Sequence, residues 1–215
     1  YTQTHSAPLA NLEFELAFFV SAVRFIQRLQ GQGVVFCRPE AEAMEARLSE
    51  AEGLANVNLA MHEVPVASNA RFDDEGRIAI LTGPNSGGKT TYLRALGLAQ
   101  VLFQAGLYVP AARARFSPVD AIFTHFPVLE TQDQGRLAEE SSRLRTIFEA
   151  VTPYSLVLLN ETFSSTTSGE AVYLAQDVLA GLRAIGARAI FATHLVELAQ
   201  QLQHIESLVE GESTL

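Results

Sequence analysis

The first thirty residues carry apolar side chains at helical spacing on two sides. Spacings of three and four place one set on a single stripe, made of Leu9, Leu12, Leu16, Phe19, Val23 and Ile26. A second stripe is made of Phe14, Phe18 and Phe25. The pattern predicts a long helix that ends at Gly31. We expect this helix to be packed in a bundle or between domains, because a lone helix in solvent would not tolerate apolar residues on two sides.

The next forty residues give weaker signals. Residues 34–36 are apolar and predict a short strand, and Pro39 suits the first turn of a helix expected at about 40–52. That helix has only a thin apolar stripe, and Gly53 would end it. Residues 54–70 show no clear period and predict a loop-rich connection.

From residue 71 onward, short segments that are apolar at every position alternate with helical patterns. The expected strands are 78–81, 121–123, 156–159 and 189–192. The expected helices are 88–104, 139–151 and 168–185, with another that begins at about 195. Strands of this kind are buried on both faces. The sequence therefore predicts an α/β fold with a largely parallel sheet covered by helices.

A glycine-rich segment follows the first of these strands and fits the pattern G-x-x-x-x-G-K-[ST]. It consists of Gly83, Pro84, Asn85, Ser86, Gly87, Gly88, Lys89 and Thr90, with Thr91 next in the chain. Glycines let successive backbone N–H groups point at a phosphate, and the following helix presents its positive N-terminal end to the same anion. In such a loop the lysine bridges the β- and γ-phosphates and the hydroxyl of Thr90 ligates Mg²⁺. With a strand before it and a helix after it, the segment predicts a P-loop site for a nucleoside triphosphate.

Two further polar groups follow buried strands. Asn160 and Glu161 come directly after 156–159, where a P-loop protein usually has an Asp that holds Mg²⁺ and a Glu that activates water. An amide carbonyl can still accept from a metal-bound water, but without the charge of a carboxylate. His194 follows 189–192, where it could bond the γ-phosphate and sense its presence. The plainer alternatives are a loop start at Asn160 and a satisfied polar residue at His194.

Charge and cysteine content narrow the function classes. Of 15 basic residues only Lys89 is a lysine, and 24 acidic residues give a net charge of −9. Such a surface repels a phosphate backbone, so a small DNA-wrapping module is excluded unless a local patch or another part makes the contact. One cysteine, Cys37, excludes an internal disulfide framework and a multi-cysteine metal site. No run of eighteen apolar residues predicts a membrane span, and no signal-like segment opens the chain, so we expect a piece of a longer cytoplasmic protein.

These elements, in this order, resemble the ATPase domain of the DNA mismatch repair MutS family. The segments that carry the resemblance are 82–85 with 87–89, 92–94, 104–106 with 109–111, 120–124, 155–161 and 191–194. The resemblance covers about residues 71 to 203. The helix at 9–30 looks like the family's last lever helix, and Asn69 is similar in position to an asparagine near the nucleotide base.

The resemblance implies an ABC-class ATPase that forms a homodimer around ATP and Mg²⁺ and couples slow hydrolysis to DNA binding. DNA repair or recombination would be the context, and other domains of the full-length protein would contact the DNA. It implies that Lys89 holds the phosphates, Thr90 and Asn160 hold Mg²⁺, Glu161 activates water and His194 senses the γ-phosphate. It also implies three parts: 1–33 as the end of a helical core or lever domain, 34–70 as a connecting segment and 71–215 as an ATPase domain without its final helices.

The sequence departs from the family at the residues that would complete a partner's site. After Gly135 and Arg136 the family usually has Ser-Thr-Phe, whereas this chain has Leu137, Ala138 and Glu139. Ser141 and Ser142 lie one helical turn later and could substitute only if the helix start moves. Together with Asn160, this points to a divergent MutS-like branch. Two alternatives stay open: a nucleotide-gated dimerisation module with little hydrolysis, or another ABC-class ATPase that does not act on mismatches, such as a transporter ATPase or a chromosome-maintenance head.

Overall fold

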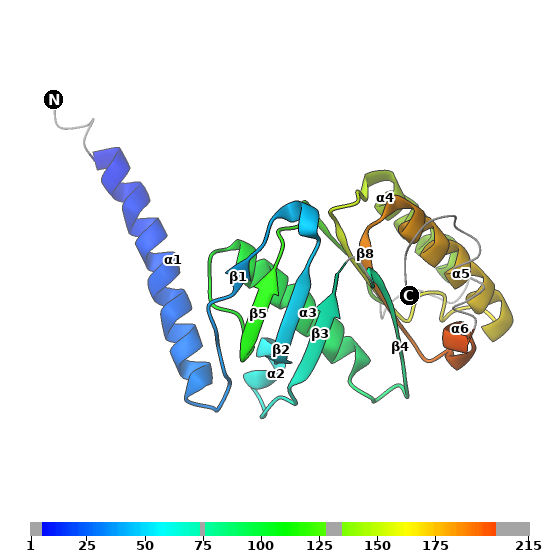
Figure 1. Ribbon diagram of the computed structural model, residues 1–215, viewed down its shortest axis with the longest axis horizontal. Coiled ribbons are helices and arrows are strands. Elements are labelled where there is room, and N and C mark those ends of the chain that lie inside the picture. Colours follow the sequence, from blue (N-terminus) through cyan, green and yellow to red (C-terminus); the bar gives the residue numbers. More distant parts are fainter. Residues whose placement is uncertain (1–5, 74–75, 128–134, 201–215) are drawn as a thin grey trace.

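Two sheets form the body of the protein, and a long helix projects from one side of it (Figure 1). The computed structural model describes residues 6–73, 76–127 and 135–200. The first sheet has the order β1-β5-β2-β3, with strands β1 (Glu40–Ala41), β2 (Ser49–Leu54), β3 (Ser68–Phe72) and β5 (Arg113–Phe116). In this sheet β2 is antiparallel to both of its neighbours, and β1 is parallel to β5.

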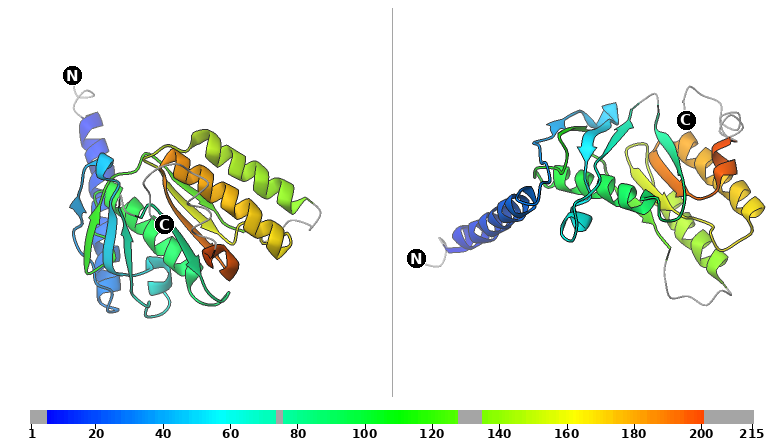
Figure 2. Two further views of the ribbon diagram at one scale, coloured as in Figure 1. Left: turned by 45° about the vertical axis from the view of Figure 1, so that its right-hand side comes forward. Right: turned by 90° about the horizontal axis from the view of Figure 1, so that it is seen from below.

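The second sheet is entirely parallel and has the order β4-β8-β7-β6. Its strands are β4 (Ile78–Thr82), β6 (Ile122–His125), β7 (Leu156–Asn160) and β8 (Arg188–Thr193). Helix α3 (Lys89–Gln104) packs between the two sheets, while α4 (Arg136–Ala150) and α5 (Ser168–Ile185) cover the other face of the parallel sheet (Figures 1 and 2). The short helices are α2 (Val57–Ala60), α6 (Val196–Gln200) and the 3₁₀ turn η1 (Met44–Ala46).

The alternation of side chains along the central strands builds two hydrophobic cores. On β7, Val157 and Leu159 face α5, whereas Leu156 and Leu158 face α3 and the first sheet. Helix α3 comes very close to β7 at Gly97, where a Cβ atom would lie 2.8 Å from a methyl carbon of Leu158. The α/β fold predicted from the sequence, with a largely parallel sheet covered by helices, is therefore confirmed.

Residues 34–70 differ from the elements expected there. The helix expected at 40–52 is wrong, because this segment contains β1, η1 and most of β2. In the first part of β2, Ser49 and Ala51 are buried and Glu50 and Glu52 are not, so the side chains there follow the period of a strand and not that of a helix. The strand expected at 34–36 is also wrong; only the next residue, Cys37, pairs with Val109 in an isolated bridge. The expected loop at 54–70 contains α2 and the start of β3.

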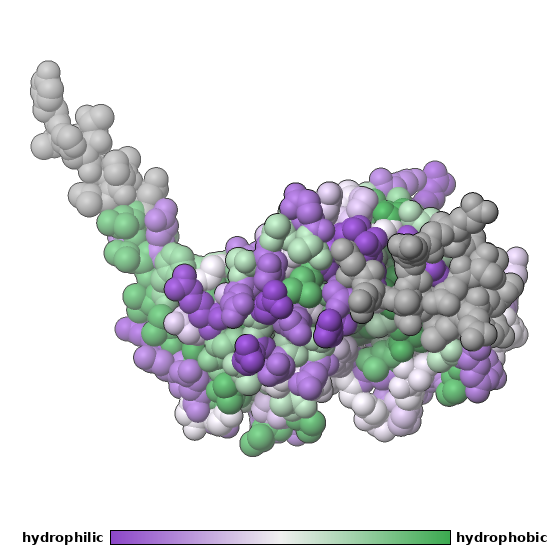
Figure 3. Space-filling model, viewed as in Figure 1, coloured by the Kyte–Doolittle hydropathy of each residue, from purple (hydrophilic) through white to green (hydrophobic). Residues whose placement is uncertain are grey.

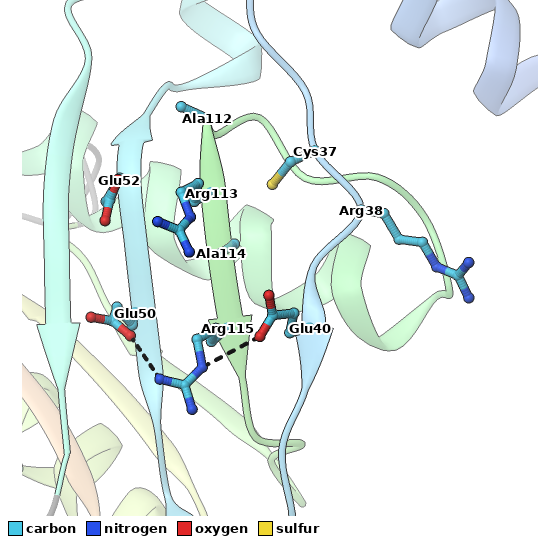
Figure 4. Close-up of a pocket in the computed structure, with 9 residues that line it drawn as sticks. All are labelled: Cys37, Arg38, Glu40, Glu50, Glu52, Ala112, Arg113, Ala114 and Arg115. Atoms are coloured by element: carbon cyan, nitrogen blue, oxygen red, sulfur yellow. Dashed lines mark hydrogen bonds and ion pairs between the residues drawn. The ribbon is translucent and has the colours of Figure 1, made fainter.

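Charged residues occupy the outer face of the first sheet (Figure 4). Arg115 on β5 lies between acidic residues of both neighbouring strands: its guanidinium nitrogens are 3.6 Å from an oxygen of Glu40 on β1 and 3.4 Å from an oxygen of Glu50 on β2. The shortest contact, 2.6 Å, is with Glu42, which follows β1. A hollow of about 410 Å³ lies among these side chains. Its lining contains three arginines and three glutamates, so the hollow offers no net charge to a ligand.

A buried arginine joins the two sheets. Arg188 begins β8 and is fully buried; its guanidinium donates to the carbonyl of Leu48 at 3.0 Å and to the Ser49 hydroxyl at 2.8 Å. It also donates to the carbonyl of Pro118 at 3.3 Å. Burial, with the nearby charge of Arg47, lowers the pKa of Arg188 to about 10, which leaves it protonated at neutral pH.

The long helix predicted from the first residues is confirmed as α1 (Ser6–Gln30). Among the side chains of α1 that the structure describes, those of its C-terminal end pack on the body, where Leu29 joins a small core with Val34 and α2. The large apolar side chains between Leu12 and Val23 are exposed in this structure, although the sequence predicts packing on both sides (Figure 3). Among the described residues, no helix combines the length and apolarity needed to cross a bilayer.

Candidate functional site

The candidate site lies at the C-terminal ends of three parallel strands, β4, β7 and β8. Thr82 at the end of β4 is in register with Thr193 on β8, and Asn160 on β7 is in register with Ala192. The glycine-rich loop, Glu161 and His194 leave these three strands in the next few residues. Neighbouring parallel strands therefore bring together three segments that lie more than thirty residues apart.

The loop between β4 and α3 wraps around the lysine side chain. Gly88 is the N-cap of α3 with φ of +82°, a conformation that favours glycine. Lys89 is 6% exposed, and its ammonium donates to the carbonyls of Gly83 at 2.8 Å and Pro84 at 3.0 Å. These bonds fix the only lysine of the chain at the centre of an exposed loop.

Two oxygen ligands of the kind that Mg²⁺ prefers lie next to each other. The Thr90 hydroxyl donates to the amide oxygen of Asn160 at 2.9 Å. The described residues contain no group of three or more His, Cys, Asp or Glu side chains placed to hold a metal. The pair fits an ion that takes most of its ligands from phosphates and water, as Mg²⁺ does, and does not fit an ion that needs a protein cage.

Glu161 contacts two of the other predicted site residues. One carboxylate oxygen lies 3.1 Å from the ammonium of Lys89, and the other lies 2.6 Å from Nδ1 of His194, whose backbone N–H also donates to it at 3.3 Å. Partial burial raises the pKa of Glu161, but hydrogen bonds from His194 and Lys89 outweigh it and hold this pKa below its usual value. Glu161 is therefore ionised at neutral pH.

A cavity of about 520 Å³ opens beside the loop. Of the predicted site residues, Ser86, Gly87, Gly88, Lys89 and Thr91 line it. Its other wall is mainly apolar and includes Val64, Val66, Leu81 and Tyr92. Val64 and Val66 are 80% and 86% exposed, so they form an apolar rim. A phosphate on the loop would leave this space for the rest of a nucleotide.

Several residues of this wall carried no signal in the sequence. Asn56 caps α2, and its side-chain nitrogen donates to the carbonyl of Thr91 at 2.8 Å. Asn69 lies nearby, but its side chain accepts from the N–H of Gly53. Ser68 lines the cavity in its place. A motif search finds neither Asn56 nor Ser68, because both lie beside the loop only through the fold.

The remaining predicted residues lie around this centre. Pro84, Asn85 and Ser86 are exposed in the loop. Ser141 and Ser142 are exposed on α4, which begins at Arg136. Among the described residues, neither serine bonds to the loop of this same chain; the sequence offered them as substitutes in a partner's site.

Comparison with known proteins adds an independent observation. A family model described as MutS domain V matches residues 79–213. The chain belongs to the MutS family. The matched region of this MutS-family chain begins within β4 and contains the loop, Asn160, Glu161 and His194.

Similar proteins carry the same family name. The chain is 38% identical over 136 residues to "DNA mismatch repair protein MutS 2" of Halobacterium salinarum, covering 62% of this chain and 16% of that protein. It is 37% identical over 149 residues to "DNA mismatch repair protein MutS" of Chlorobium limicola, covering 68% and 17%. With the protein of that name from Chlorobium phaeobacteroides it is 30% identical over 219 aligned residues, covering 99% and 24%. The chain thus spans a quarter or less of the length of these MutS relatives.

Proposed function

We propose that this chain is the ATP-binding and hydrolysing module of a MutS-like protein of DNA mismatch repair or recombination. The observation that carries the proposal is the convergence of Lys89, Thr90, Asn160, Glu161 and His194 at one edge of the parallel sheet. Family membership supports the context, and the names of the relatives supply mismatch repair. Residues 71–215 would form the ATPase domain, with 1–33 from a helical lever domain and 34–70 between them.

The proposed chemistry assigns a distinct task to each group. Lys89 and the loop would hold the phosphates, and the apolar rim of the cavity would cover the base. Mg²⁺, held by Thr90 and Asn160, would neutralise charge on the phosphate oxygens. Glu161 would orient and polarise the attacking water; its low pKa favours this role over complete removal of a proton. His194 would hold the Glu161 carboxylate and sense the γ-phosphate.

A second candidate function is nucleotide-gated association with little hydrolysis. Asn160 favours it, because a neutral amide attracts Mg²⁺ less than a carboxylate does. In both cases two copies would close around ATP. DNA would be bound by other domains of the full-length protein. The chain would represent a divergent, ABC-class branch of the family.

Single-turnover ATP hydrolysis separates the two candidates. For the first, we expect Glu161→Gln to lower the rate at least a hundredfold, because the amide cannot polarise water as a carboxylate does. Affinity for a fluorescent ADP analogue should change less than threefold. The matched control is Glu149→Gln, which removes an exposed carboxylate on α4.

Two outcomes would contradict the first candidate. A Glu161→Gln variant that hydrolyses ATP at the parent rate would show that Glu161 does not activate water. If the unsubstituted protein binds the ADP analogue but does not measurably hydrolyse ATP, nucleotide-gated association is favoured instead.

A further inference from the structure

The loop after β7 has an unusual backbone. Glu161 and Phe163 are non-glycine residues with φ of +49° and +65°, in the left-handed region that L-residues avoid. Thr162 stands between them and is 2% exposed. Because each positive φ costs free energy, the surroundings must enforce this conformation. The carboxylate that contacts Lys89 and His194 therefore depends on a backbone that would otherwise relax.

A buried histidine contacts the middle residue of this loop. His125 ends β6, is 1% exposed, and places Nδ1 3.1 Å from the Thr162 hydroxyl. Its other ring nitrogen is buried and has no hydrogen-bond partner among the described residues. Thr162 is thus the polar contact of the ring. The bond forms in either tautomer of the neutral ring, because a hydroxyl both donates and accepts.

The surroundings of His125 keep the ring neutral. Burial, reinforced by the charge of Arg143 on α4, lowers the pKa of His125 to about 4. The Arg143 guanidinium donates to the carbonyl of Phe126, the residue after His125, at 3.2 Å. A neutral ring in a fixed position is suited to hold a neighbour and not to exchange protons at neutral pH.

The C-terminal part of the loop after β7 makes a separate hydrogen bond to α4. The Ser165 hydroxyl donates to a carboxylate oxygen of Glu140 on α4 at 3.2 Å, and Glu140 is 9% exposed. This bond lies beyond Phe163, on the side away from Glu161. The chain therefore offers a matched comparison: one side-chain bond inside the left-handed turn, and one outside it.

We infer that His125 is a positioning residue for Glu161, which it holds through Thr162 in the left-handed conformation that directs the carboxylate towards Lys89 and His194. The inference rests on the proposed role of Glu161 in ATP hydrolysis. It adds a residue that no motif contains and that lies 36 positions away from Glu161 in the chain.

The test compares variants of the intact protein in single-turnover ATP hydrolysis. His125→Leu and Thr162→Val should each lower the rate about tenfold, the usual effect of one lost hydrogen bond, and should leave the Kd for a fluorescent ADP analogue within twofold. Thr162→Ser and His125→Asn, which keep a polar atom in place, should recover most of the rate. The double variant should be no slower than either single variant, because both remove the same bond.

Ser165→Ala is the control within the same loop and should lower the rate less than threefold. The inference is overturned if Thr162→Val hydrolyses ATP at the parent rate, or if Ser165→Ala loses as much activity as Thr162→Val. It is also overturned if Thr162→Ser, folded by its thermal unfolding midpoint, stays as slow as Thr162→Val. A Glu161→Gln variant with the parent rate would instead refute the proposed function.

Discussion

Asn160 receives a hydrogen bond from Thr90 without contributing a charge to the site. The carboxylate that P-loop proteins usually carry here would attract Mg²⁺ more strongly, and the geometry leaves room for the exchange because Asn and Asp have the same shape. Asn160 therefore differs from an aspartate at this position in charge and not in size.

We expect Asn160→Asp to lower the Mg²⁺ concentration needed for half-maximal ATP hydrolysis by about tenfold, the effect of one added charge at a partly screened site. A Mg²⁺ titration of the single-turnover rate measures it. Asp177→Asn, an exposed change on α5, is the control. Loss of nucleotide binding in Asn160→Asp would show that Asn160 does not stand at the metal position.

The site residues that the sequence predicts are those with a motif. Lys89, Thr90 and Glu161 follow from the spacing of a P-loop and from the polar end of a buried strand. His125 and Asn56 could not be predicted, because each acts on a segment far away in the chain and its own neighbours are unremarkable. A histidine at the end of an apolar strand is more often a satisfied core residue, and only the fold brings it to Thr162.

At the scale of elements, the parallel sheet could be predicted from the sequence, whereas the first sheet could not. Each parallel strand contains an unbroken run of apolar residues, so the sequence pattern alone predicts these strands. Strand β2 instead reads Ser-Glu-Ala-Glu-Gly-Leu, which has good helix formers and little apolar surface. Its strand conformation is imposed by neighbours: Glu50 is in register with Arg115 on one side and with Arg71 on the other. Cross-strand charge pairs of this kind become visible only when the partners are known.

The hydrogen bonds of Arg188 connect the two sheets, and their contribution to stability can be tested. Arg188→Met removes three hydrogen bonds of a buried guanidinium and leaves their acceptors without this donor, so the free energy of unfolding should fall by about 2 to 4 kcal/mol. Chemical denaturation measures it. Arg145→Met, which breaks an exposed pair with Glu149, should cost less than about 0.5 kcal/mol. Equal losses in both variants would mean that Arg188 contributes no more than a surface charge.

At the scale of the molecule, α1 dominates the exposed apolar surface. Phe14 is 76% exposed, and Phe18 and Phe19 are 50% and 49% exposed on the same helix. Apolar area of this extent usually marks a contact surface. Such a surface can associate without nucleotide, whereas the proposed dimer forms around ATP.

Size-exclusion chromatography should resolve these two kinds of association. We expect the 215-residue chain to elute larger than a monomer even without ATP, and the double substitution Phe14→Ser with Phe18→Ser to restore the monomer volume. In that variant, ATP with Glu161→Gln should still shift the peak to a dimer. A nucleotide-dependent shift that disappears with the two phenylalanines would place the dimer contact on α1 and contradict the proposed arrangement.

Strands β7 and β8 form a wall that both hydrophobic cores share. Neither core can lose its packing without exposing one face of these strands, and Arg188 ties the start of β8 to the first sheet. Backbone amides in β7 and β8 should therefore exchange with deuterium only when the whole body unfolds, whereas those of the projecting part of α1 exchange by local fraying. Exchange at Leu158 and Ile190 then reports the global stability directly, and ADP, if it binds as proposed, should slow both amides by the same factor.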